Sequence, residues 1–315
     1  MLYFDATTIR ARLPWSRMLV ALDAMLKDDV VAPLRAHHAV EVPGEPAASL
    51  LLMPAWRSGR RLGVKLVTVF PGNALRNERA VGAVYALFDA RNGALLALFD
   101  GEELTARRTA GASAYAARRL ARADARHLVV AGSGRIAREL VAAHCSVRPI
   151  ERVSLWSRDP QHAQDAAAAI ARDGLAVTVV RDLEPAVRAA DIVCCATLST
   201  APIVLGAWLP PGVHLDLVGA FRLHMRETDD AAIARADVIV VDSRAGALAE
   251  GGDIAQALRS GAIGEAAIAA DLADLARGAH PGRTRADEVT VFKSVGFALE
   301  DLAAAESVLD AVASG

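Results

Sequence analysis

Long apolar runs and clusters of basic residues are both missing from this sequence. No uninterrupted apolar stretch of about 18 residues, the length needed to cross a bilayer, occurs in it. The first residues also lack the basic segment and apolar run of a secretory signal. The net charge is −2, and Lys and Arg are spread along the chain without a basic block interleaved with aromatic residues. We therefore expect a cytoplasmic protein that binds neither membranes nor nucleic acid but small molecules.

Cysteine is also scarce, with three residues at Cys145, Cys194 and Cys195. Their number is odd and their spacing matches no metal-binding motif, which suits a reducing compartment. Each lies in an apolar segment, where a free thiol usually serves as a small buried hydrophobic side chain. We therefore expect no metal site and no catalytic thiol.

The length and composition are those of a packed protein with more than one core. The chain has 315 residues, of which 53% are hydrophobic, and two domains of roughly 100 to 200 residues each are the default expectation. The periodicity changes near residue 112. Before that point strand-like runs dominate, with a turn signal at Arg91-Asn92-Gly93; they cover residues 49–53, 63–70, 82–89 and 94–99. This part is expected to form an antiparallel sheet.

After residue 112, short apolar runs alternate with Ala-rich helical segments. The runs cover residues 127–131, 152–156, 175–180, 191–196, 214–218 and 237–241. This alternation indicates an α/β fold with a doubly wound parallel sheet, the Rossmann architecture. Residues 288–315 begin with a short strand and continue as a helix over about 297–312, which we expect to pack on the first part. The predicted domains are a Rossmann domain, 113–287, and a discontinuous α+β domain, 1–112 completed by 288–315.

A glycine-rich turn opens the predicted Rossmann domain. It follows the apolar run 127–131, precedes a helical segment, and has the form G-x-G-x-x-A: Gly132, Ser133, Gly134, Arg135, Ile136 and Ala137. Gly132 permits the tight turn, Gly134 lets the backbone approach a pyrophosphate, and Ala137 lets helix and strand pack closely. The phosphates would then meet the free N–H groups of the helix amino terminus. This context favours a nicotinamide dinucleotide site over a merely structural turn.

The end of the next strand bears on the choice of cofactor. NAD enzymes place an acidic residue there for the ribose 2′-hydroxyl, whereas this sequence has Ser157 and Arg158. An arginine attracts a 2′-phosphate and a serine can donate a hydrogen bond to it, so NADPH is favoured and NADH is the alternative. Asp159 either caps the following helix together with Pro160 or reaches a ribose.

Thr197 ends a later strand, at the edge where open α/β sheets bind ligands. Its hydroxyl either touches the ribose or nicotinamide, or caps its own strand, and the sequence leaves both readings open.

Lys65 lies inside an apolar strand-like run, where alternation puts it on one face with Gly63, Val67 and Val69. Burial without a partner lowers the pKa of an ammonium group, which makes Lys65 a candidate acid, base or anion ligand. The spacing alone supports an edge-strand lysine that discourages aggregation equally well.

Several of these motifs together resemble the ornithine cyclodeaminase and μ-crystallin family. The resemblance covers nearly the whole chain in order, through residues 53–56 (MPAW), 63–73 (GVKLVTVFPGN), 104–110 (LTARRTA), 132–137, 218–220 (VGA) and 291–296 (VFKSVG). It implies a dinucleotide domain inserted into a substrate domain that also dimerises, with the chemistry in the cleft between them. A homodimer is therefore expected.

The resemblance also implies roles for individual residues. By motif, Lys65 looks like the active-site lysine, and Arg108 resembles the arginine that binds the substrate carboxylate. Arg35 resembles a second such arginine, and the planar guanidinium group suits bidentate binding of a carboxylate. Arg107 is expected to face solvent. Further positions resemble those that line the active site and the nicotinamide pocket, namely Asn73, Ser294 and Gly296.

One departure from the family pattern concerns the activity. Cyclodeaminases carry an aspartate directly after Gly-Ala, but here Phe221 follows Gly219 and Ala220. Phenylalanine can neither bind an ammonium group nor transfer a proton, which counts against ammonia elimination from ornithine. The segment instead resembles that of bacterial ketimine reductases. His224 lies nearby in a polar loop, which favours a non-catalytic role.

The leading hypothesis is therefore NAD(P)H-dependent reduction of a cyclic imino acid. The resemblance implies Δ1-pyrroline-2-carboxylate and Δ1-piperideine-2-carboxylate as substrates, with proline and pipecolate as products. Alternative activities are ornithine cyclodeaminase and amino-acid dehydrogenase. A crystallin-like protein that binds NADPH or another small ligand without turnover is the non-enzymatic alternative.

Overall fold

The computed structural model describes residues 2–172 and 174–313, and it divides into two compact units. Unit 1 comprises Met1–Arg108 and Phe297–Gly315, and unit 2 comprises Thr109–Gly296. Helix α3 (Gly101–Leu120) begins in unit 1 and ends in unit 2. No helix within the described residues is long and apolar enough to cross a membrane.

Unit 1 is built on a six-stranded sheet of order β1-β6-β5-β4-β3-β2. Its neighbours pair antiparallel, except that β1 runs parallel to β6 at one edge. The strands are β1 (Leu2–Phe4), β2 (Ala36–Val40), β3 (Ala48–Arg57), β4 (Arg61–Val69), β5 (Val81–Asp89) and β6 (Leu95–Asp100). The β5–β6 hairpin turns at Gly93, whose φ of 75° suits glycine. The antiparallel sheet expected from the sequence is present.

Three helices complete unit 1: α1 (Ala6–Arg12), α2 (Trp15–Lys27) and α11 (Ala298–Ala313). Helix α11 packs on β3 and β4 and also on α2, so its apolar side chains have neighbours on more than one side. Leu302, Ala303 and Val308 are fully or almost fully buried. The carboxyl-terminal helix therefore completes the core of unit 1, although the whole of unit 2 precedes it in the sequence. A short 3-10 helix, η1 (Pro71–Arg76), connects β4 to β5.

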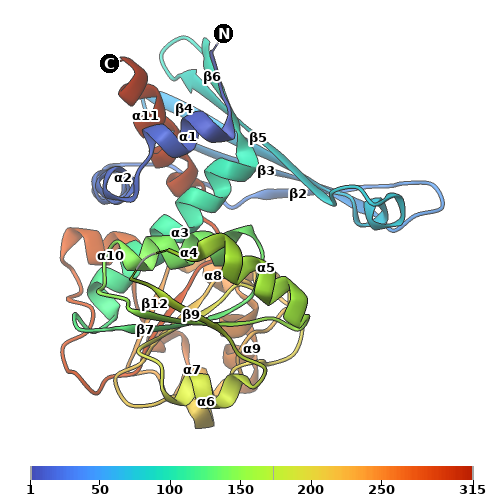
Figure 1. The fold of residues 1–315 in the computed structure, drawn as a ribbon. Coiled ribbons are helices and arrows are strands. Elements are labelled where there is room, and N and C mark those ends of the chain that lie inside the picture. Colours follow the sequence, from blue (N-terminus) through green and yellow to red (C-terminus); the bar gives the residue numbers. More distant parts are fainter. Residues whose placement is uncertain (1, 173, 314–315) are drawn as a thin grey trace. The chain divides into compact units, whose positions relative to one another are not determined.

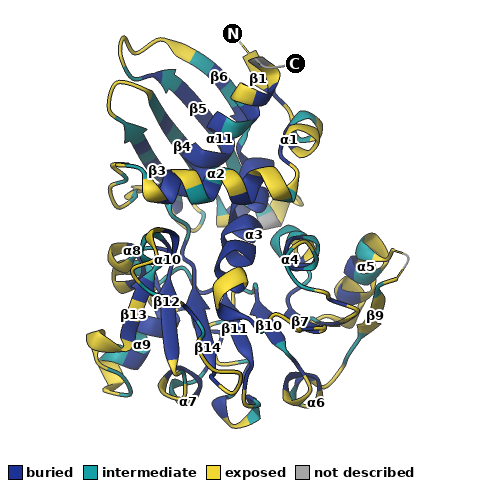
Figure 2. Ribbon diagram, turned by 90° about the vertical axis from the view of Figure 1, so that its left-hand side faces the viewer, coloured by how far each residue is buried: buried dark blue, intermediate teal, exposed yellow. Residues whose placement is uncertain are grey.

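Unit 2 contains an eight-stranded sheet of order β13-β12-β14-β11-β10-β7-β8-β9, and all its pairs are parallel. The central strands are buried along their whole length (Figure 2), as expected when helices cover both faces of a sheet. The strands are β7 (His127–Ala131), β8 (Arg152–Trp156), β9 (Ala176–Val179), β10 (Ile192–Cys195), β11 (His214–Leu217), β12 (Val238–Val241), β13 (Ile268–Asp271) and β14 (Thr290–Lys293).

Helices lie on both faces of this sheet. Figure 1 shows α4 and α5 on one face and α6 and α7 on the other. The helices of unit 2 besides α3 are α4 (Arg135–Cys145), α5 (Pro160–Ile170), α6 (Leu183–Arg188), α7 (Asp230–Ala234), α8 (Arg244–Glu250), α9 (Gly252–Ser260) and α10 (Leu272–Arg277), with 3-10 turns η2 (Gly206–Trp208) and η3 (Glu265–Ala267). The predicted α/β fold with a doubly wound parallel sheet is confirmed.

The placement of β14 corrects one expectation. The sequence assigned residues 288–315 as a block to the domain of residues 1–112, but β14 lies inside the parallel sheet of unit 2. Val291 pairs with Leu215 of β11 on one side and with Ile239 of β12 on the other. All four residues of β14 (TVFK) are buried, but so short a strand-like segment does not say which sheet the strand joins.

Candidate functional site

The first turn of unit 2 requires glycine at its first position. Gly132 follows β7 with φ of 137°, a conformation that L side chains rarely adopt. A Cβ at this position would lie 2.7 Å from the carbonyl oxygen of Ala196 and 3.5 Å from the Cβ of Ala137. Ala137 is buried at this contact, so its small side chain lets α4 approach the strand closely.

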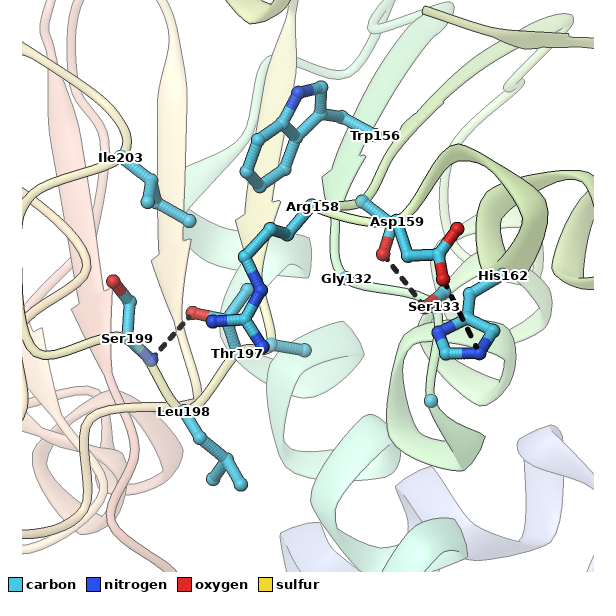
Figure 3. Close-up of a pocket in the computed structure, with 13 residues that line it drawn as sticks. Gly132, Ser133, Trp156, Arg158, Asp159, His162, Thr197, Leu198, Ser199 and Ile203 are labelled. Carbon is cyan, nitrogen blue, oxygen red and sulfur yellow. Dashed lines mark hydrogen bonds and ion pairs between the residues drawn. The ribbon is translucent and has the colours of Figure 1, made fainter. Parts of the chain in front are cut away.

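Gly134 differs, because a Cβ at Gly134 would meet nothing within 4 Å. It is the N-cap residue of α4, and no side chain caps the helix there. Gly132, Ser133 and Gly134 line one wall of a cavity of about 530 Å³, shown in Figure 3. An open glycine before an uncapped helix amino terminus leaves room for a phosphate group against the backbone N–H groups. These residues fit the pyrophosphate of a dinucleotide.

The cavity wall after β8 carries one arginine and one carboxylate, which caps a helix. Ser157 and Arg158 both line the cavity, and the Ser157 hydroxyl lies 3.1 Å from that of Ser133. Arg158 is exposed and makes no hydrogen bond or ion pair with the described residues. Asp159 accepts a hydrogen bond from the backbone N–H of Gln161 at 2.9 Å, so its carboxylate caps α5.

The sequence reasoning missed His162 in this wall. Its imidazole is exposed, lines the cavity, and lies 3.9 Å from the Asp159 carboxylate (Figure 3). The available signal was its place in the first turn of the helix that Asp159 caps.

Thr197 lines the opposite wall, and its hydroxyl donates a hydrogen bond to a carboxylate. Both the backbone N–H and the hydroxyl of Thr197 donate to Glu227 Oε1, at 2.6 and 2.8 Å. The other carboxylate oxygen of Glu227 accepts from the Gly219 N–H at 2.7 Å. Burial raises the pKa of Glu227 to about 7, although the nearby Lys293 ammonium opposes this shift. Glu227, which the sequence reasoning did not single out, thus joins the ends of β10 and β11.

The other residues expected to bind the cofactor do not line this cavity. Arg135 and Ile136 are half-buried in the first turn of α4. Ser294 and Gly296 follow β14, where Asp242 Oδ2 accepts from the Ser294 hydroxyl at 3.2 Å and from the Gly296 N–H at 2.7 Å. Asp242 therefore fixes the conformation of the segment after β14.

Phe221 lies in unit 2, after β11, whereas the other expected substrate residues lie in unit 1. It is half-buried, and its backbone N–H donates to the Gly219 carbonyl oxygen at 2.8 Å. His224, three positions further on, is exposed.

Lys65 is not an edge-strand residue. It lies on β4, opposite Met53 of β3 on one side and Tyr85 of β5 on the other. Its side chain is 2% exposed. The alternative of an aggregation-blocking edge lysine is therefore wrong, because β4 has a neighbouring strand on each side.

Two carboxylates of α11 bind the buried cations Lys65 and Arg108. Lys65 Nζ lies 2.8 Å from Asp301 Oδ2 and 3.0 Å from Oδ1. Arg108 Nε donates to Asp301 Oδ1 at 2.9 Å, and Arg108 Nη1 donates to Glu300 Oε2 at 2.8 Å. The sequence reasoning missed both acids, although adjacent acidic residues in an apolar helix were a visible signal.

The charges around Lys65 act in opposite directions. Burial lowers the pKa of Lys65 to about 8; the Arg108 charge adds to this effect, Asp301 opposes it, and Arg35 lowers the pKa further. Although burial acts to lower it, the pKa of Arg108 is raised by Asp301 and Glu300. The structure thus brings Lys65 and Arg108 together, with Arg35 close enough to act on Lys65.

Asn73 serves the loop after β4. It lies on η1, where its side-chain amide donates to the Arg79 carbonyl oxygen and accepts from Arg76 Nη2, both at 2.7 Å. Among the described residues, Asn73 has no hydrogen bond to Lys65 or Arg108.

Arg107 corrects another expectation, because it is buried rather than facing solvent. Its Nη2 donates to the carbonyl oxygen of Leu13, and its guanidinium carbon lies 3.7 Å from the ring centroid of Trp15. The hydrogen bond joins α3 to the segment between α1 and α2, and the cation–π contact joins α3 to the first residue of α2.

A cluster in unit 2 offers ligand atoms of a kind that metals bind. Atoms of His144, Cys194 and Asp216 lie within 4.8 Å of one another, and all three side chains are buried. They also hydrogen bond to one another, since His144 Nε2 lies 3.2 Å and Cys194 Sγ 3.3 Å from Asp216 Oδ2. Burial raises the pKa of Cys194 well above its ordinary value, so the thiol keeps its proton and can donate it to Asp216. We interpret the cluster as a buried hydrogen-bond network.

Related sequences, a solved structure and a family profile all match this chain over most of its length. Δ1-Pyrroline-2-carboxylate reductase of Paracoccus denitrificans is 41% identical over 310 residues, covering 95% of this chain and 92% of that protein. Ketimine reductase mu-crystallin of Mus musculus is 37% identical over 265 residues, covering 84% and 80%. A solved structure of Thermococcus litoralis Δ1-pyrroline-2-carboxylate reductase in complex with NADH and L-proline is 31% identical and has a TM-score of 0.92, covering 100% and 98%. The sequence profile of one family matches residues 24–315. The chain belongs to the ornithine cyclodeaminase/mu-crystallin family.

Proposed function

We propose that this protein reduces a cyclic ketimine, Δ1-pyrroline-2-carboxylate or Δ1-piperideine-2-carboxylate, to the cyclic L-amino acid with NADPH. The observation that carries the proposal is the buried pair of cations in unit 1, in which Lys65 and Arg108 bind the same carboxylate. Relatives named as reductases of this substrate class support it. Within the protein itself, the glycine turn of unit 2 supports the use of a dinucleotide.

Arg108 is proposed to bind the substrate carboxylate, with Arg35 as a second cation. A guanidinium group has five N–H donors. Two nitrogens of Arg108, Nε and Nη1, donate to Asp301 and Glu300, while Nη2 makes no hydrogen bond with the described residues. Arg108 therefore has donors left for a carboxylate and is held in place by the donors already used.

Lys65 is proposed to orient the imine and to supply a proton to its nitrogen. With a pKa of about 8, its ammonium form is present at neutral pH and its proton is released more readily than that of an ordinary lysine. The nicotinamide, when bound, supplies the hydride. Hydride addition to C=N needs a protonated nitrogen, so a proton donor and a carboxylate anchor are the two groups that this reaction requires.

NADPH is proposed as the preferred cofactor, with NADH as the alternative. Arg158 has a free guanidinium group at the cavity wall, and the nearby Asp159 carboxylate is used as a helix cap. Arg158 therefore offers a 2′-phosphate a cation that makes no ion pair with the described residues, while one oxygen of Asp159 accepts from the helix. The homodimeric state and the cytoplasmic location expected from the sequence stay predictions.

Spectrophotometry with purified protein tests the proposal. NADPH oxidation should follow addition of either cyclic imine, while ornithine should release no ammonia and proline should reduce NAD⁺ much more slowly. Ammonia release from ornithine without net cofactor change would establish a cyclodeaminase, and NAD⁺ reduction by an open-chain amino acid would establish a dehydrogenase. NADPH binding without turnover of either imine would favour the non-enzymatic alternative.

A further inference from the structure

We propose that Asp301 is a positioning residue, whose single carboxylate holds the Lys65 ammonium and the Arg108 guanidinium side by side for one small substrate. The inference rests on the proposed function, because it assigns Asp301 to the site in which Lys65 and Arg108 act.

The geometry joins three separate elements. Asp301 is in the first turn of α11, Lys65 is on β4, and Arg108 is on α3. Asp301 Oδ1 accepts from both cations, at 3.0 Å from Lys65 Nζ and 2.9 Å from Arg108 Nε. Because one oxygen contacts both, a displacement of Asp301 changes the spacing of the two cations that are expected to contact substrate.

Burial makes this carboxylate necessary. The side chains of Lys65, Arg108 and Asp301 are 2%, 5% and 0% exposed. Two adjacent cations without a counterion in such surroundings are costly, and each charge lowers the affinity of the other group for its proton. Asp301 therefore offsets the repulsion between Lys65 and Arg108.

Other charged groups face Lys65 but do not replace Asp301. Arg35 precedes β2 and adds positive charge. Tyr85 of β5 is neutral, because burial and the Asp301 charge raise its pKa well above 10. Glu300 binds Arg108. Within the described residues, Asp301 is the carboxylate in ion-pair contact with Lys65.

The charge of Asp301 therefore sets the protonation of Lys65. Asp301 raises the pKa of Lys65 by its charge and by its hydrogen bonds, against burial and Arg108, which lower it. Without that charge, Lys65 would lose its proton at a lower pH, and a smaller fraction of it would be protonated for the imine near neutral pH.

A titration that does not depend on turnover tests this role. The chain has three lysines, Lys27, Lys65 and Lys293, so protein with ¹³C-labelled lysine side chains gives few Cε signals by NMR. The Lys65 signal should titrate near pH 8. In Asp301→Asn, an isosteric change that removes the charge, its midpoint should fall by roughly one unit or more. Lys293, which pairs with Asp253 in unit 2, gives the internal reference signal.

Kinetics with matched variants distinguish the effect of the charge of Asp301 from the effect of its position. Asp301→Asn should lower kcat at pH 8 at least about fivefold and move the high-pH limb of the kcat profile to lower pH. Asp301→Glu keeps the charge but displaces the carboxylate. It should therefore lower kcat, while the high-pH limb of the kcat profile stays near its original pH. Glu300→Gln removes the negative charge that pairs with Arg108 and should mainly raise KM for the imine.

Two outcomes would overturn the inference: an unchanged Lys65 midpoint in Asp301→Asn, or full kcat in Asp301→Glu when Asp301→Asn does not fold. NADPH binding by each variant, measured by fluorescence, reports whether unit 2 is intact. If the unchanged protein reduces neither imine while the Lys65 midpoint still falls in Asp301→Asn, the proposed function fails and the control of Lys65 by Asp301 stands.

Discussion

The hydroxyl of Tyr85 occupies the space that a side chain at Gly63 would need. A Cβ at Gly63 would lie 1.8 Å from the Tyr85 hydroxyl oxygen and 2.5 Å from the ring carbon that bears it. Gly63 is on β4, two residues before Lys65 and on the same face of the strand. The absence of a side chain at position 63 thus makes room for a buried tyrosine next to Lys65.

Gly63→Ala should therefore destabilise the protein and impair turnover. Overpacking of this kind typically costs about 1–3 kcal/mol, which lowers Tm by several degrees in a domain of this size. Thermal unfolding followed by circular dichroism measures the loss. Gly82→Ala on β5 is the matched control, because a Cβ there would meet only the flexible end of Thr68 at 3.2 Å. Equal Tm values for the two variants would contradict the expected clash.

Tyr85→Phe should stabilise the protein. The Tyr85 hydroxyl is buried and has no hydrogen-bond partner in the part of the chain that the structure describes. An unsatisfied buried polar group costs about 1–3 kcal/mol, so its removal should raise the free energy of unfolding by about 1 kcal/mol. Chemical denaturation measures this change. A large loss of turnover instead would indicate that the hydroxyl binds substrate.

Gly134→Val should leave the fold intact and abolish cofactor binding. A side chain at Gly134 meets no protein atom within 4 Å but enters the cavity at the amino terminus of α4. The added methyl groups would occupy the place proposed for the pyrophosphate, so the Kd for NADPH should rise more than about tenfold. Gly264→Val is the control, because Gly264 is also open and does not line the cavity. Fluorescence titration with NADPH distinguishes the two variants.

The fold of unit 2 was predictable because each of its signals is local. The glycine turn lies between a strand and a helix, and apolar runs alternate with helical segments over short distances. The membership of β14 was not predictable in the same way. Its partners, β11 and β12, are chosen by long-range packing, and a strand of four residues, TVFK, fits either unit equally well.

The same contrast holds for the residues of unit 1. Lys65 and Arg108 stand in recognisable motifs, but Asp301, which binds both, lies 236 and 193 residues away from them in the sequence. The apolar pattern of the last helix predicts its packing but does not indicate which cations its acids bind. Lys65 is not at an edge because β4 has a strand on each side. That arrangement depends on the order of strands in the sheet and not on the local sequence pattern.

Arg158→Ala should weaken NADPH binding and leave NADH binding nearly unchanged. A hydrogen bond to a charged group contributes about 1.5–3 kcal/mol, which corresponds to a loss of roughly ten- to hundredfold in NADPH affinity. Arg181→Ala serves as the control, because Arg181 is an exposed arginine of unit 2 that does not line the cavity. Parallel loss of NADPH and NADH affinity in Arg158→Ala would indicate that Arg158 does not read the 2′-phosphate.

Lys65 should give both turnover and stability a dependence on alkaline pH. Its pKa is about 8 in the folded protein and 10.5 ordinarily, so between these values the unfolded chain binds a proton that the folded chain has lost. The contribution of Lys65 to stability is therefore least favourable below about pH 8 and improves as the pH rises toward 10.5. In Lys65→Met this dependence should be absent, and comparison of unfolding free energies at pH 7 and pH 9.5 measures it.

Turnover should depend on alkaline pH in the opposite direction to stability. Because the protonated form of Lys65 is proposed to supply the proton, kcat should fall as pH rises through about 8. Lys65→Met should lose turnover while it still binds NADPH, since the glycine turn belongs to unit 2. Lys27→Met removes an exposed lysine that pairs with Asp23, and it should keep both the turnover and the alkaline limb. A fully active Lys65→Met variant would remove Lys65 from the mechanism and leave Arg108 as the cation on which substrate binding depends.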